Sequence, residues 1–294
     1  MNWSVERVTS PEDFLQRTAS FRNEHPMETN VIGSVAASVA DGTRAYPICF
    51  WWIVLADNRV VGIAMRTAPY RLLLSPMPEG AARQLARAVV VSDPGCWGVT
   101  GPEEVASEFI ESWCDQTGKQ RSDFPLHMRD TIYVLKQHTP RADVLGGARK
   151  ADDHDVALLL KWLLAFAEEV GVFHADVPSE EELRNRLRST SIVIWEAEGH
   201  SVAMAGHAPL VEGPNGRIGR IGPVYTEPDE RGHGYGAAVT SSMIEHLHSI
   251  NCSTVMLYAD SNYEKSNRVY QGLGFRPVGA IVEFGLEPPA DTQL

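Results

Sequence analysis

Hydrophobic and polar positions along the first half of the chain alternate between strand-like and helix-like patterns. Apolar runs rich in β-branched and aromatic residues predict strands, whereas apolar residues three or four positions apart predict helices. Ser10 followed by Pro11 indicates a helix start, with serine as the N-cap and proline at the first helical position. The expected strands are 3–8, 50–55, 60–67, 70–74 and 128–136, and the expected helices follow Ser10 and cover 30–39, 81–89 and about 103–117.

The second half repeats this order of patterns. Ser179 and Glu182 form a capping box before a short helix. The expected helices are 156–170, 180–189, 237–249 and 265–271, and the expected strands are 192–198, 201–210, 217–226, 254–259 and 277–286. Each half therefore has the order βαα, three antiparallel strands, α, β, α and a closing strand, which indicates a tandem duplication. A linker is expected at 137–150, where the glycines could also belong to a short crossing strand.

One stretch of the second half stands out chemically, because three glycines alternate with other residues just before a helix. The run is Arg231-Gly232-His233-Gly234-Tyr235-Gly236. Such a turn presents unpaired N–H groups at the positive end of a helix dipole, which favours an anion and above all a phosphate. A P-loop would need a lysine and a hydroxyl that are not here. Gly232, Gly234 and Ala237 fit a dinucleotide fingerprint in letters, but no βαβ repeat with a ribose-binding acid surrounds them.

Composition narrows the class of protein. At 294 residues the chain is long enough for two domains, and 44% hydrophobic and 22% charged residues are typical of a soluble globular protein. The net charge of −12 argues against nucleic-acid binding and favours a cationic or neutral small substrate. No apolar run reaches membrane-spanning length and no signal peptide is evident, so we expect a cytoplasmic protein without a membrane partner.

The four cysteines are isolated along the sequence. Cys49, Cys96, Cys114 and Cys252 form no Cys-x-x-Cys pair, so they are expected to be reduced thiols, neither disulfide nor zinc site.

Two motifs of the second half resemble the GNAT superfamily of N-acetyltransferases. Arg231, Gly234 and Gly236 satisfy Arg-x-x-Gly-x-Gly, the acyl-CoA pyrophosphate loop of that superfamily. About thirty residues later, Asn267 and Tyr270 begin an Asn-x-x-Tyr helix that ends in Gly-Phe at 274–275. The resemblance implies an α+β fold of two tandem GNAT-like domains, each a central, mostly antiparallel sheet flanked by helices. It places a degenerate domain at 1–138 and a catalytic domain at 145–294.

The resemblance also assigns a cofactor, acetyl-CoA, and the residues that would hold it. Loop amides would bind the CoA diphosphate, with Arg231 as a charge-assisted donor, and the strand end would pair with the pantetheine arm through its backbone. Asn267 would contact pantetheine or nearby phosphate. The implied set is Val224, Tyr225, Arg231, Gly232, His233, Gly234, Tyr235, Gly236 and Asn267. His233 could equally be a solvent-exposed side chain between the glycines.

Acid and base roles follow from direct acyl transfer to a neutral amine. Tyr270 matches the tyrosine that protonates the departing thiolate in many members of the superfamily. Glu227, at the strand end, is the candidate base, and the alternative is a solvated acid that precedes the loop. His207 is more simply explained as a satisfied core histidine, and Glu168 and Glu169 as solvent-facing acids.

The first half departs from the family pattern where the loop should be. Residues 75–80 read Ser-Pro-Met-Pro-Glu-Gly, and two prolines without N–H donors and an added carboxylate are unsuited to a diphosphate. We therefore expect this half to brace the catalytic half and to wall its acceptor site, with Trp51, Trp52 and Trp97 facing either the substrate or the core. The predicted function is an acetyl-CoA-dependent N-acetyltransferase of a small-molecule or peptide amine. Alternatives are a non-catalytic acyl-CoA-binding or regulatory module and a dinucleotide enzyme.

Overall fold

The computed structural model describes residues 3–141, 143–171, 177–189 and 191–285. Two compact units divide these residues. The first unit holds the described residues up to Ile132 together with 260–262 and 279–285, and the second unit holds the remainder from Tyr133 onward. The expected division at 138–145 assigned the whole C-terminal strand to the second domain, whereas its last residues group with the first unit.

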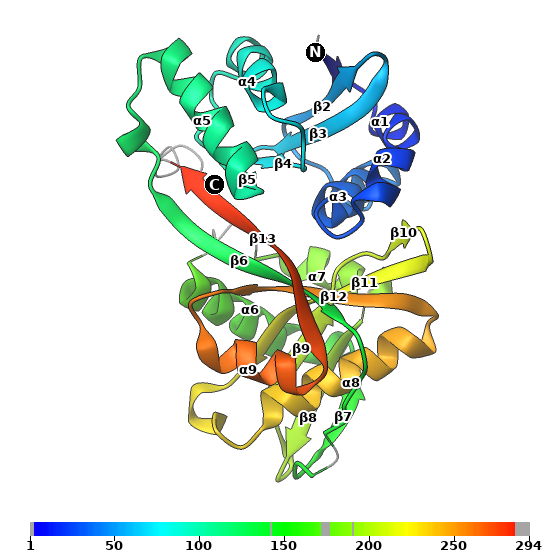
Figure 1. Ribbon diagram of the computed structural model, residues 1–294. Helices are drawn as coiled ribbons and strands as arrows, with labels where there is room; N and C mark the ends of the chain where they lie inside the picture. Colours follow the sequence, from blue (N-terminus) through cyan, green and yellow to red (C-terminus); the bar gives the residue numbers. More distant parts are fainter. Residues whose placement is uncertain (1–2, 142, 172–176, 190, 286–294) are drawn as a thin grey trace. The chain divides into compact units, whose positions relative to one another are not determined.

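The first unit contains one sheet with helices on both faces (Figure 1). Its strands lie in the order β1-β2-β3-β4-β5-β13, and only β4 and β5 pair in parallel. The elements are β1 (Trp3–Val8), α1 (Pro11–Arg17), α2 (Ala19–Glu24), α3 (Asn30–Ala40), β2 (Cys49–Ala56), β3 (Arg59–Thr67), β4 (Leu72–Leu74), α4 (Ala81–Ser92), β5 (Gly98–Gly101), α5 (Glu103–Thr117), a 3-10 turn (Arg121–Asp123) and β6 (Leu126–Leu135).

Side-chain alternation on β2 explains the two faces of this sheet. Trp52 and Val54 pack with α4 and α5, whereas Trp51 and Ile53 point to the opposite face and pack with α1 to α3. Trp51, Trp52 and Trp97 are all at most 2% exposed. These tryptophans are therefore core residues, and the alternative that they face a substrate is wrong.

The second unit has the same plan. Its strands lie in the order β13-β6-β12-β11-β9-β8-β7, with β10 on the side of β11. The elements are β7 (Gly147–Lys150), a 3-10 turn (Asp153–Asp155), α6 (Val156–Val170), α7 (Glu180–Ser189), β8 (Ile192–Ala197), β9 (His200–His207), β10 (Val211–Gly213), β11 (Gly216–Thr226), a 3-10 turn (Pro228–Glu230), α8 (Tyr235–Ser249), β12 (Cys252–Asp260), α9 (Glu264–Gly272) and β13 (Phe275–Gly285).

Two hydrophobic clusters cover the two faces of the second sheet. The first, called the α8 cluster below, joins α8, through residues such as Met243 and Leu247, to Trp195 and Ala205 of the sheet. The second, called the α6 cluster below, joins α6 and α7 to strand residues that point to the other face, among them Tyr225. Helices α6 and α8 therefore lie on opposite faces of β11, and this separation matters for the site below.

Local chemistry explains why the elements begin where they do. The Ser10 hydroxyl accepts from Asp13 N, and Ser179 and Glu182 bond each other reciprocally as a capping box requires. The expected order of elements recurs in both halves, with an added helix, α2, in the first half and an added strand, β10, in the second. The mixed α/β fold expected from the sequence is confirmed.

The structure differs from the expected elements at several points, and helix α2 was not expected as a separate element. Residues 147–150 of the expected linker form strand β7, which pairs with β8. A short strand, β10, forms a hairpin with the start of β11 and was not predicted. Helix α8 begins two residues earlier than expected, at Tyr235. Leu286, the expected end of the last strand, lies outside the described residues.

Candidate functional site

The glycine loop meets helix α8 at Gly234, which adopts the left-handed conformation with φ of +87° and caps the helix. No side chain caps this terminus. The N–H groups of residues 232–237 donate no hydrogen bond to any described part of the chain. Unpaired N–H groups at the positive end of a helix dipole attract an anion. The loop therefore forms the anion-binding geometry that its sequence predicts.

The glycines leave little room for substituents on one side of the loop. A Cβ at Gly234 would lie 3.2 Å from Val144 Cγ2, and a Cβ at Gly236 would lie 3.2 Å from Thr226 Oγ1. At Gly232, where φ is +93°, the space is open. Backbone conformation at Gly232 and Gly234, and close neighbours at Gly234 and Gly236, explain why this loop uses glycine.

The strand that leads into the loop separates from its parallel neighbour. Pairing of β11 with β12 ends at Ile221 and Leu257, although both strands continue. A register shift between Ile221 and Val224 on the β9 side marks the same point. From there on, β11 pairs only with β9 among the described strands. Val224 and Tyr225 thus lie on a strand segment with one edge open to an extended ligand.

The side chains of these two strand residues take different directions. Val224 packs against the α8 cluster, and Tyr225 belongs to the α6 cluster with its ring 6.1 Å from that of Trp162. Burial raises the pKa of the Tyr225 hydroxyl. Any contact of these residues with an extended ligand would therefore come from their backbone.

Arg231 points to the α6 face of the sheet. Its Nε donates to Thr226 O at 3.1 Å, and its Nη2 donates to Glu169 Oε1 at 2.5 Å. The guanidinium also lies over the Tyr225 ring, 5.8 Å from the centroid. Glu169 is exposed, as its expected place on the solvent side of α6 requires, but its carboxylate is paired with Arg231.

Glu227 is held by two donors from α6. Lys161 Nζ and Trp162 Nε1 donate to the same carboxylate oxygen at 2.7 Å and 2.6 Å. Burial by itself would raise the pKa of Glu227, but the two hydrogen bonds outweigh it and the pKa is lowered. A carboxylate with a lowered pKa is a weak proton acceptor at neutral pH. The geometry thus favours an ionised, anchored group at Glu227 over a base. Nothing in the sequence pattern marked Lys161 or Trp162 as a hydrogen-bond partner of Glu227.

Helix α9 carries the other two predicted residues. Tyr270 is half-buried against the α8 cluster, between the rings of Tyr133 and Phe275 at 6.4 Å and 6.2 Å. Burial raises the pKa of its hydroxyl to about 12, and that hydroxyl makes no hydrogen bond with the described chain. Because its pKa is raised, Tyr270 remains protonated over the physiological range. Asn267, on the same helix, is buried, and its Nδ2 donates to Tyr263 O.

The histidines considered from the sequence have structural partners. His207 Nε2 accepts a hydrogen bond from Ser191 N, and His207 Nδ1 is hydrogen-bonded to Ala208 O. His207 is therefore a core histidine whose two ring nitrogens both have hydrogen-bond partners. His233 is exposed, stacks on Tyr235 and bonds Glu230 O. Tyr235 itself is buried in the core, so only its amide can face a ligand.

The first unit preserves the glycine cap but fills the anion position with its own carboxylate. Gly80 caps α4 with φ of +89°, as Gly234 caps α8. The Gly80 amide, however, donates to Glu108 Oε1 at 2.8 Å, and Arg83 bonds the same oxygen. A diphosphate at this helix terminus would have to displace a carboxylate that already has two donors.

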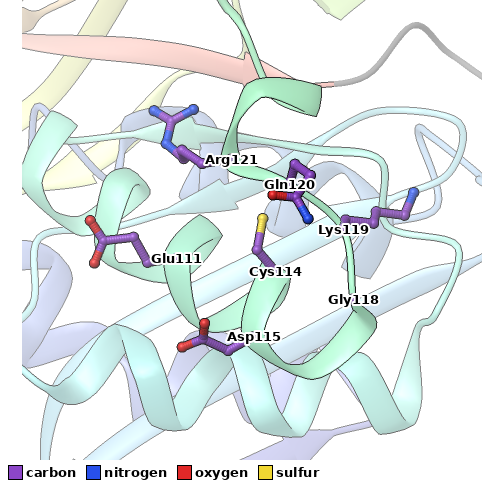
Figure 2. A pocket seen from close by; sticks show the side chains of 7 residues that line it. All are labelled: Glu111, Cys114, Asp115, Gly118, Lys119, Gln120 and Arg121. Atoms are coloured by element: carbon purple, nitrogen blue, oxygen red, sulfur yellow. The ribbon is translucent and has the colours of Figure 1, made fainter.

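A surface hollow lies elsewhere in the first unit, at the end of α5 (Figure 2). It measures about 400 Å³ and surrounds Cys114 with charges of both signs, including Asp115 and Arg121. Burial raises the pKa of the Cys114 thiol, which disfavours a nucleophilic thiolate. None of the predicted site residues lines this hollow.

All four cysteines are free thiols, as expected. No group of three or more His, Cys, Asp or Glu residues in the described ranges could hold a metal ion. None of the helices that the structure describes is long and apolar enough to cross a membrane.

The separating strands and the uncapped helix α8 lie within a region that matches a known protein family. Residues 157–275 match the model of the acetyltransferase (GNAT) family, so this part of the chain is a GNAT domain. The family predicted from the glycine loop and the Asn-x-x-Tyr helix is confirmed.

Similar proteins extend the comparison. A mycothiol acetyltransferase of Thermobispora bispora is 42% identical over 64 residues, 22% of each chain. A tandem GNAT protein from the clavulanic acid biosynthesis pathway has the same fold, with a TM-score of 0.58, 16% identity and coverage of 98% and 99%. A GNAT-family acetyltransferase from Colwellia psychrerythraea gives 0.57 at 12% identity, with coverage of 97% and 100%. The matched stretches span about a quarter of the length of the curated relatives.

Proposed function

We propose that the protein is an acetyl-CoA-dependent N-acetyltransferase whose chemistry lies in residues 145–294. One observation carries the proposal: the unbonded amides of residues 232–237 adjoin the end of the separated β11 strand. The first feature suits a diphosphate and the second an extended pantetheine arm. GNAT-fold proteins use acetyl-CoA, and the residues present fit that group.

The chain supplies positioning and hydrogen bonds for the acyl transfer. Acetyl-CoA provides an activated acyl group on a thioester. The acceptor amine attacks with its lone pair only when neutral, so its proton must pass to water or a base, and the carbon–sulfur bond then breaks with release of thiolate. Because the pKa of Tyr270 is about 12 and that of a thiol is about 8.5, complete proton transfer from Tyr270 is uphill. We infer that its hydroxyl donates a hydrogen bond to the leaving sulfur.

The acceptor is proposed to be the primary amine of a small molecule or peptide. The relatives named mycothiol acetyltransferase make an acceptor of that pathway one candidate, and the net charge of −12 favours a cationic or neutral one. The decisive assay measures CoA release from acetyl-CoA with aminoglycosides, polyamines, amino acids, peptides and amino-sugar conjugates. Release with one amine class supports the enzyme. CoA binding without release from any amine would favour a non-catalytic acyl-CoA-binding module.

The stoichiometry of CoA binding should be one per chain. The second unit leaves its helix-terminal amides unbonded, whereas Glu108 occupies the corresponding place at Gly80. Calorimetric titration of the whole chain with CoA measures this number directly. A stoichiometry of two would contradict the assignment of the first half as a domain without a CoA loop.

Replacement of Glu227 by glutamine should leave the shape of the pH–rate profile unchanged between pH 6 and 9. The lowered pKa of Glu227 keeps the group ionised throughout this window, so its titration cannot produce a limb there. We expect the rate to fall less than about tenfold, through loss of charge beside Lys161. If kcat/KM of the unaltered protein rises with pH near neutrality and the variant lacks this rise, Glu227 is instead the base.

A further inference from the structure

Arg231 is the charged residue of the glycine-loop motif, yet its contacts lead away from the loop amides. Its guanidinium donates to Thr226 O at the end of β11 and to Glu169 of α6, and it lies over the Tyr225 ring. Tyr225 belongs to the α6 cluster on one face of the sheet. Helix α8, which begins at the glycine loop, packs on the opposite face. The charge of Arg231 is therefore directed to the α6 face.

Helix α6 is well placed to hold the loop in this way. Arg149 bonds both oxygens of Asp155 immediately before the helix begins, and Trp162 is fully buried within the α6 cluster. These contacts hold the helix in place, and with it the position of Glu169. Lys161 and Trp162 also bind Glu227, which lies four residues before Arg231. The segment from Glu227 to Arg231 is consequently tied to α6 at both ends.

We propose that Glu169 and Arg231 are positioning residues for the cofactor loop, and that the CoA diphosphate is bound by the main-chain amides without the Arg231 side chain. This inference rests on the proposed function, because it concerns the same CoA site. The Glu169 carboxylate fixes the guanidinium, and the guanidinium fixes Thr226 and the first residue of the loop. The pair thereby sets the angle at which the amides of 232–237 face the diphosphate.

The proposal predicts a specific pattern in a double-mutant cycle. Arg231→Gln and Glu169→Gln should each weaken CoA binding by about threefold to fivefold, since both break the same exposed ion pair. The double variant should bind CoA no more weakly than Arg231→Gln alone, because the contact between the two side chains can be lost only once. The exchanged pair, Arg231→Glu with Glu169→Arg, should recover part of the affinity.

A matched control is available one residue away. Glu168 lies beside Glu169 on α6, is exposed and makes no interaction with the described chain. Glu168→Gln makes the same charge change without touching Arg231, so CoA affinity should stay within about twofold of the unaltered protein. Thermal unfolding of every variant should show one cooperative transition, which separates a local change in the loop from loss of the fold.

Salt dependence distinguishes positioning from direct phosphate binding. CoA affinity is measured by calorimetry from 50 to 500 mM KCl for each variant. A positioning role predicts that Arg231→Gln lowers affinity but keeps the slope of log affinity against log salt, and that it raises KM for acetyl-CoA with little effect on kcat. A direct contact would make the slope shallower in the variant, because salt screens the attraction between a guanidinium and the phosphate charge that the variant has lost.

Two outcomes would overturn the inference: a reduced salt slope in Arg231→Gln, or weakened binding in Arg231→Gln with unchanged or tighter binding in Glu169→Gln. Absence of CoA binding in the unaltered protein is a different result, which contradicts the proposed function itself.

Discussion

Replacement of Gly234 by glutamate is expected to abolish CoA binding. Gly234 caps α8 with φ of +87°, a conformation that costs a residue with a Cβ about 1–2 kcal/mol. The new Cβ would lie 3.2 Å from Val144 Cγ2. More importantly, a carboxylate would stand at the helix terminus where the diphosphate is to bind, and two anions would compete for one set of amides. We expect calorimetry to show affinity reduced more than about 100-fold, which corresponds to about 2.7 kcal/mol.

Gly216 provides the matched control for this substitution. It lies at the start of β11, the opposite end of the strand from the loop, also with positive φ of +106°. A Cβ there would lie 3.1 Å from Ser253 Oγ, a similar degree of crowding. Gly216→Glu should therefore cost similar stability without weakening CoA binding. Retention of full affinity in Gly234→Glu would show that the loop is not the diphosphate site.

Replacement of Tyr270 by phenylalanine should reduce kcat by about 100-fold while CoA affinity changes less than about threefold. The hydroxyl makes no hydrogen bond with the described chain, so its removal costs no internal contact. The ring keeps its packing between Tyr133 and Phe275. What is lost is the donor to the leaving sulfur, and a positioned acid or donor contributes about 100-fold or more. Single-turnover acetyl transfer, with CoA binding measured in parallel, separates the two effects.

Tyr133 is the natural control for Tyr270. Its ring neighbours that of Tyr270, and its hydroxyl accepts a hydrogen bond from Gln271 Nε2 at 3.2 Å. Tyr133→Phe removes a hydroxyl in the same way, from a buried ring that packs against the ring of Tyr270. This variant should lower the rate by only a few fold. Equal losses in both variants would mean that packing around α9, and not the Tyr270 hydroxyl, limits the reaction.

The two variants together test separate parts of the site. Gly234→Glu concerns binding of the diphosphate at α8, and Tyr270→Phe concerns the chemical step beside α9. Loss of binding in the first and loss of rate in the second would support an acetyltransferase. Loss of binding in the first with no measurable transfer by the unaltered protein would support the acyl-CoA-binding module.

Local patterns in the sequence determined much of this fold. The range of α6 was predicted to the residue, from Val156 to Val170, because its apolar positions repeat with the helical period. In the structure, Gly171 ends this helix in the left-handed conformation. Ser10 and Ser179 marked helix starts through short-range hydrogen bonds. The glycines at 232 and 234 take positive φ, as their spacing suggested. All of these features depend on residues close together in the chain.

Tertiary structure decided the contacts between distant residues. No local pattern links Arg231 to Glu169, 62 positions earlier, or Gly80 to Glu108 on the next helix. The closing strand gave no sign that its residues 282–285 would pair with β5 of the first unit. The glycine-rich sequence by itself determined that an anion site could form at α8. Packing of α6 against β11 decided where the arginine of that motif points, because a side chain's direction depends on the partners that folding brings to it.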